Sequence, residues 1–227
     1  MKKFVSVFLL FAGIFCSSAA AYEDYGDSYW PKSYFITAGI GAVFSNGDLN
    51  EKAFHIRDSL DQKVSVHAPD ISLMGNPEIG VGVNIRSFSL VFAYQYWRGS
   101  EKLTDLSHEG EQDYRLWRAG IEFTYNLMWP EDFQVGLGLG YSYTNFKTEN
   151  TAYLDDDPED TEMMACSIAF IANVHYYFTE HLAVVPSIKV YESWFMRAYT
   201  DYTESYDLDP FIWQTFIAAN IAVQFQF

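Results

Sequence analysis

The sequence predicts an all-β protein: a single eight-stranded antiparallel up-and-down β-barrel that spans a membrane. Three observations carry the prediction. Apolar residues alternate with small or polar ones along eight segments, short and long connections alternate between these segments, and the charges within them share one face. Alternation with a period of two is the pattern of a strand with one apolar side, whereas a helix repeats every 3.6 residues.

The first 21 residues have the three parts of a secretory signal peptide. Lys2 and Lys3 precede an apolar run, and small residues follow it up to Ala21. The run is shorter than the roughly 20 apolar residues of a spanning helix, which argues against an anchor. We expect cleavage after Ala21, then a short tail at residues 22–32 and the barrel domain at residues 33–227.

The first four expected strands contain apolar residues at every second position, opposite Gly, Ser, Thr, Asn or a charge. A very short turn near Ser87 joins the second to the third. Their apolar faces consist of Tyr34, Ile36, Ala38, Ile40, Ala42 and Phe44; of Ile79, Val81, Val83 and Ile85; of Leu90, Phe92, Tyr94 and Tyr96; and of Trp117, Ala119, Ile121, Phe123, Tyr125 and Leu127.

The other four strands continue the pattern. In the fifth, Gly136, Gly138 and Gly140 occupy the small face, and each would cost a helix about 1 kcal/mol relative to alanine. Their apolar faces consist of Phe133, Val135, Leu137, Leu139, Tyr141 and Tyr143; of Ile168, Phe170, Ala172, Val174 and Tyr176; of Leu182, Val184, Pro186, Ile188 and Val190; and of Phe211, Trp213, Ile217, Ala219, Ile221, Val223 and Phe225.

Connection lengths alternate along the chain. Turns near Ser87, Pro130 and Glu180 are short, and long polar connections are expected at residues 45–77, 98–113, 147–162 and 193–210. Short turns at one end and long loops at the other are typical of membrane barrels. A ten-strand alternative arises because Lys63–Ala68 also alternates, but this stretch is shorter than the roughly 9 to 11 residues of a spanning strand.

The residue types of the polar face distinguish a membrane barrel from a soluble one. This face contains mainly Gly, Ala, Ser, Thr, Asn and Gln, which suits a narrow lumen. The strand-core charges that share it are Glu78, Arg86, Arg118, Glu122 and Lys189. A lipid-facing Arg or Lys near the midplane would cost roughly 2 to 4 kcal/mol, so the apolar face is expected to point outward. Glu192 is an exception, at the point where its strand leaves the membrane.

Aromatic residues gather near the strand ends, as in the girdles of membrane barrels. The expected girdle residues are Tyr94, Tyr96, Trp97, Trp117, Tyr141, Tyr143, Phe225 and Phe227.

With its leader, its eight amphipathic strands and Phe227 at the end, the chain resembles the small outer-membrane β-barrels of diderm, Gram-negative bacteria, of the OmpA, OmpX and OmpW type. The resemblance implies location in the bacterial outer membrane, at the cell surface. It also implies outer-membrane lipids and lipopolysaccharide as partners, and recognition of Phe227 by the barrel-assembly machinery.

Composition argues against several functions. The net charge of −16 would repel nucleic acid, and Cys166, alone after cleavage, supports neither an internal disulfide nor a metal site. His175 is expected to be a hydrogen-bonded filler of the lumen. We expect no enzyme activity and assign no catalytic, cofactor-binding or metal residue.

The function expected is structural or interactive at the surface, with a side-chain-filled lumen and long acidic loops. Arg118, Glu122 and Lys189 are predicted to form an ion-paired plug, because buried charges persist only when paired. A narrow porin or a lipid-modifying barrel enzyme is a less favoured alternative.

Two loop features suggest ligands. The acidic run Asp155–Asp160 is read as a solvated loop tip, with the further hypothesis that divalent cations bridge it to lipopolysaccharide phosphates. Tyrosine and acid recur together at residues 22–30 and 197–210, so a surface adhesin or ligand-binding barrel is the alternative function.

Overall fold

The structure is a computed structural model. It describes residues 33–227 except 51–52, 58–62, 68–70, 72, 86, 104–109, 130–132, 155–156 and 201–204. At residues 53–57, 63–67, 101–103, 110–112, 128–129, 150–154, 157–159, 200 and 205–210 it describes the strand path alone. The expected signal peptide and tail, residues 1–32, lie outside the described residues.

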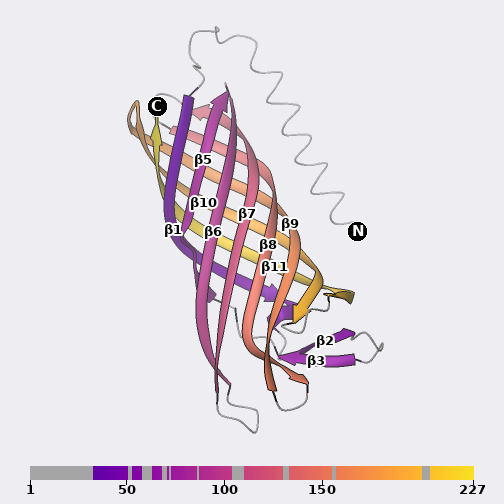
Figure 1. The fold of residues 1–227 in the computed structure, drawn as a ribbon. Helices are drawn as coiled ribbons and strands as arrows, with labels where there is room; N and C mark the ends of the chain where they lie inside the picture. The colour runs from indigo at the N-terminus through magenta and orange to yellow at the C-terminus, as the bar shows by residue number, and fades with distance from the viewer. Residues whose placement is uncertain are drawn as a thin grey trace.

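Eight strands form a closed ring in which every neighbour pair is antiparallel, as predicted (Figure 1). The ring closes where β1 pairs with β11, from Phe35 opposite Gln226 to Gly47 opposite Gln214. The ring strands are β1 (Ser33–Gly47), β5 (Glu78–Ile85), β6 (Phe88–Leu103), β7 (Gly110–Trp129), β8 (Phe133–Leu154), β9 (Asp157–Thr179), β10 (Leu182–Thr200) and β11 (Ser205–Gln226).

The remaining elements are short: the 3-10 turn η1 (Asp48–Asn50) and the strands β2 (Ala53–Arg57), β3 (Lys63–His67) and β4 (Leu73–Gly75). Of these, β4 pairs with β1 in the same register as β5, so it extends the barrel wall beyond the start of β5. The β2–β3 hairpin meets β8 at one pair, Val66 opposite Ala152, and in Figure 1 it lies at the end opposite the C-terminus. The alternating stretch at residue 63 therefore forms a strand but adds none to the barrel. No helix among the described residues is long and apolar enough to span a membrane.

The predicted alternation of faces is confirmed. Outward apolar side chains are widely exposed, including Ile40 at 75%, Ile221 at 62% and Tyr141 at 60%. Inward positions at the same levels contain small, amide or hydroxyl residues such as Asn220 and Ser142, which are buried. An exposed apolar belt as continuous as this one indicates a surface that faces a membrane or a partner and not water.

The strands are longer than predicted. β8 and β9 have 22 and 23 residues, about twice what a spanning strand needs. Much of the predicted loops at 98–113 and 147–162 is therefore strand, with β6 continuing to Leu103 and β7 beginning at Gly110.

In these extensions the polarity of the two faces is reversed. The inward side chains of Leu116, Phe146 and Phe195 are fully buried, while the outward ones nearby include Asp113 and Arg115. The expectation of a polar lumen is wrong for the half of the barrel that contains the strand extensions. An extension surrounded by water needs a polar outside and an apolar core, as any soluble barrel does.

Candidate functional site

A buried ion cluster crosses the middle of the lumen. Lys189 on β10 lies 2.7 Å from a carboxylate oxygen of Glu78 on β5, and 2.7 and 2.9 Å from the two oxygens of Glu122 on β7. Each side chain is exposed by 10% or less. The three come from strands on different sides of the ring, so their contact bridges the lumen.

Arg118 does not make the ion pair predicted for it. Three aromatic rings surround it instead: the guanidinium carbon lies 3.9 Å from the ring centroid of Tyr191, 4.8 Å from that of Phe216 and 5.3 Å from that of Trp97. Stacking on rings suits a guanidinium because it is planar and weakly hydrated. The predicted plug is therefore part ion pair and part cation–π cage.

Arg118 also donates two hydrogen bonds to its cross-strand neighbours. Nε donates to Thr144 Oγ1 at 2.9 Å, and Nη1 donates to Gln95 Oε1 at 3.4 Å. Glu78, Gln95, Arg118 and Thr144 are consecutive members of one inward row across β5, β6, β7 and β8. Side chains directly opposite on one face are close enough to bond.

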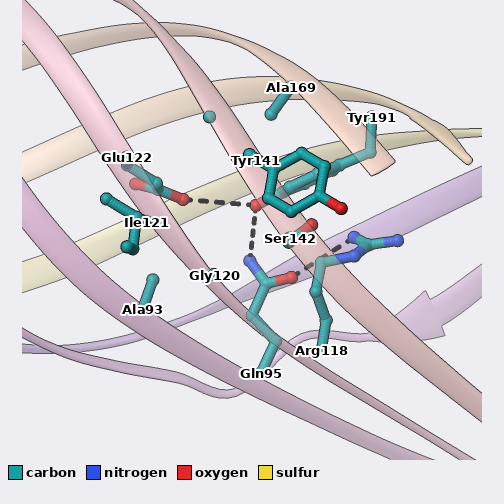
Figure 2. Close-up of a pocket in the computed structure, with 11 residues that line it drawn as sticks. Ala93, Gln95, Arg118, Gly120, Ile121, Glu122, Tyr141, Ser142, Ala169 and Tyr191 are labelled. Atoms are coloured by element: carbon teal, nitrogen blue, oxygen red, sulfur yellow. Dashed lines mark hydrogen bonds between the residues drawn. The ribbon is translucent and has the colours of Figure 1, made fainter. Parts of the chain in front are cut away.

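Gln95 and Tyr191 connect the two parts of the site (Figure 2). Gln95 Nε2 donates to Glu78 and, at 2.9 Å, to the hydroxyl of Tyr191. That hydroxyl donates to Glu122 at 3.4 Å. With two cations and two carboxylates the cluster balances in charge, the condition under which buried ions are tolerated.

Small residues make room for these long side chains. Ala93, Gly120, Gly140 and Ala169 line the same pocket, whose free volume is about 10 Å³. A single water needs about that much space. The lumen at this level is filled.

An apolar layer fills the lumen on the long-loop side of the cluster. Its largest members are fully or almost fully buried: Trp97, Leu116, Phe146, Met163, Phe195 and Phe216. Trp97, expected in a girdle, points inward with 2% exposure. It immediately follows Tyr96 on the apolar face, so the strand period alone indicates its orientation.

Amides and hydroxyls occupy the lumen on the short-turn side. Asn126 donates to Ser89 at 2.6 Å, and Ser89 donates to Asn84 at 2.6 Å. His175 is 4% exposed and stacks on Tyr177. The expected hydrogen bonds of its ring are missing, because neither nitrogen reaches a partner among the described residues.

The outer face has aromatic clusters at the start of the extensions. Trp117 lies between Tyr94 and Tyr143, at centroid distances of 6.4 and 5.4 Å. Glu192 points outward as expected, and accepts hydrogen bonds from the indole of Trp213 at 2.8 Å and from Thr215 at 2.9 Å.

Other predicted features give no site within the described part of the chain. No group of three or more His, Cys, Asp or Glu there is arranged to hold a metal ion. Cys166 accepts a hydrogen bond from Tyr141 on the outer face. Arg86 lies outside the described residues, as do the side chains of the acidic run Asp155–Asp160 except Asp160.

No family model matches this sequence, and no curated protein matches it either. Solved structures do match. Neisserial surface protein A (NspA) has a TM-score of 0.55 and 12% identity over 87% of this chain and 99% of that one. OprG from Pseudomonas aeruginosa has a TM-score of 0.52 and 13% identity over 87% and 97%.

A major outer membrane protein from Thermus thermophilus is similar at a TM-score of 0.53 and 9% identity, over 87% of this chain and all of that one. At identities this low, the structural similarity shows a shared fold alone. That fold is the one of the small bacterial outer-membrane barrels.

Proposed function

We propose that this chain, which has the fold of the small bacterial outer-membrane β-barrels, is an integral outer-membrane protein that conducts no ions and acts structurally or as an interaction surface. The exposed apolar belt supports insertion, because it would aggregate in water. The filled lumen supports the absence of conduction. We expect no enzyme activity, and His175 stays a filler in this proposal.

The observation that carries the proposal is the pair of successive obstructions in the lumen. The ion cluster at Lys189 spans the ring, and the apolar layer around Phe146 lies beyond it. An ion would have to displace both. An eight-strand ring is just wide enough for side chains to fill it.

Planar-bilayer recordings test this directly. The purified barrel is expected to give no steady single-channel conductance, while a 16-stranded porin in the same bilayer provides the positive control. A large, steady conductance of the unaltered barrel would overturn the proposal. A Phe146→Ala, Phe195→Ala variant should also stay closed, because the ion cluster remains.

Membrane insertion has its own test. After cell fractionation the protein should be in the outer membrane and should migrate differently on a gel before and after boiling. Recovery as a freely soluble monomer would refute insertion.

Surface capture of a ligand is the second candidate. The strand extensions, with β9 reaching 23 residues, support it because they hold a large surface clear of the membrane. Removing the connection at residues 201–204 should abolish binding to target cells and leave the heat-modifiable gel shift intact. Equal binding by the shortened protein would exclude this role for the connection.

A further inference from the structure

Three basic residues form a continuous row on the outer face of the barrel. Arg98 on β6 is directly opposite Arg115 on β7, and Arg115 is directly opposite Lys147 on β8. Opposed residues of antiparallel strands share a face. Arg98 and Arg115 are exposed, so this face is the outward one.

The row is unexpected on this protein. The chain has 30 acidic and only 14 basic residues, yet three of the basic ones are adjacent. Like charges directly opposite each other destabilise a sheet. An anion placed against the row would relieve that repulsion.

Acidic neighbours within the chain neutralise the row only in part. Lys147 lies 2.7 Å from Asp160 and directly opposite Glu162 on β9, but Arg98 is 3.6 Å from Asp113 with 70% of its side chain exposed. An ion pair as exposed as this one contributes little to stability. Among the described residues, the central Arg115 has no carboxylate within ion-pair distance.

The position of the row along the strands indicates which anion it meets. Arg98 follows Tyr96 by two residues, Arg115 precedes Trp117 by two, and Lys147 follows Tyr143 by four. These aromatics end the apolar belt, and girdle aromatics lie at headgroup level. Beyond the cations the outward residues become acidic, at Asp113 and Glu149.

The height of the row agrees with this layering. From Phe133 to Lys147, β8 climbs about 35 Å if it rises 3.3 Å per residue at a tilt of roughly 40°, whereas the apolar band of a membrane barrel is about 25 Å tall. Lys147 therefore lies several ångströms outside the hydrocarbon, at the depth of lipid phosphates.

We propose that Arg98, Arg115 and Lys147 form a binding site for a phosphorylated lipid headgroup of the outer leaflet, with the acyl chains of that lipid against the apolar belt below. Arginine suits this role because its fork of donors matches phosphate oxygens. The inference rests on the proposed function, since it requires the barrel to be in the outer membrane.

The test measures lipid binding by the full-length protein, purified in a zwitterionic detergent. The probes are lipopolysaccharide, the same lipid with its phosphates removed, and inorganic phosphate. Arg115→Gln is compared with Arg197→Gln, which removes an exposed arginine from the outer face of β10, away from the row.

Arg115→Gln should weaken lipopolysaccharide binding about fivefold, the effect of one cation near an anionic surface. Arg197→Gln should change it less than about twofold, and Arg115→Lys should recover most of the loss. Removing the phosphates should weaken binding by the unaltered protein and abolish its advantage over Arg115→Gln.

Three results would overturn the site: equal weakening by Arg115→Gln and Arg197→Gln, equal affinity for the dephosphorylated lipid, or inorganic phosphate bound as tightly as the lipid. Gel shifts and fractionation of every variant separate the two proposals. A protein that fails to insert refutes the proposed function, whereas one that inserts normally but binds without regard to Arg115 refutes this inference alone.

Discussion

The guanidinium carbon of Arg118 lies 3.9 Å from the ring centroid of Tyr191, within the barrel lumen. The same tyrosine donates its hydroxyl hydrogen to Glu122 and accepts one from Gln95. Tyr191 thus connects Arg118 to Glu122, the carboxylate that accepts hydrogen bonds from Lys189. The stability of the lumen should depend on both parts of this arrangement.

Lys189→Met should lower the free energy of unfolding by about 3 to 5 kcal/mol, because it leaves Glu78 and Glu122 buried without a cation. Urea unfolding in lipid vesicles measures the loss. Adding Glu78→Gln and Glu122→Gln to Lys189→Met should recover most of it. A loss below about 1 kcal/mol for the single variant would show that the pairs contribute little.

Arg118→Lys should destabilise the barrel by about 1 to 2 kcal/mol although it keeps the charge. An ammonium group cannot stack as a flat guanidinium does, and it cannot bond in the same geometry to Thr144 and Gln95. Arg98→Lys is the matched control on the exposed face, with an expected change within about 0.5 kcal/mol. Equal effects of the two variants would argue against the aromatic cage.

Gly138→Ala should cost about 1 to 3 kcal/mol by overpacking. A Cβ there would lie 2.1 Å from the backbone oxygen of Phe123, which cannot move aside without breaking the strand pair. At Gly75 a Cβ meets nothing within 4 Å, so Gly75→Ala should change the unfolding free energy by less than about 0.5 kcal/mol. Thermal unfolding of both variants makes the comparison.

Phe227→Ala should reduce the amount of assembled barrel in cells while barely changing the stability of protein folded in vitro. The Phe227 ring is 64% exposed, and its backbone closes the ring through two hydrogen bonds with Tyr34 that the substitution leaves in place. Phe225→Ala, on the same face, is the control. If both variants assemble equally poorly, loss of girdle aromatics explains the defect and recognition of the terminal residue does not.

Prediction from sequence was most accurate for features that depend on the residues of one strand alone. All eight ring strands and their outward faces follow from alternation, since period two shows in any single segment. Their up-and-down order follows from the alternation of short and long connections. The inward placement of Glu122 and Lys189 follows in the same way. Alternation also indicates that Trp97 points inward, although the gathering of aromatic residues near strand ends predicted a girdle position for it.

The sequence does not predict the strand extensions, because apolar and polar residues exchange faces there. Around Phe146 the apolar residues lie on the inward face and polar ones such as Lys147 on the outward face, so the stretch looks like a polar loop. Only a ring closed in three dimensions shows that strands continue past the apolar belt into a second environment.

The sequence by itself determined the part of each strand that forms the apolar belt and which side of that part faces the lumen, because that choice is local. Which side chains meet inside was decided by the tertiary structure. Arg118 lies against Tyr191 and Phe216 while Lys189 takes both carboxylates, and Lys189 and Glu78 are 111 residues apart. The register of eight strands around the ring sets these distances, and no single segment contains that register.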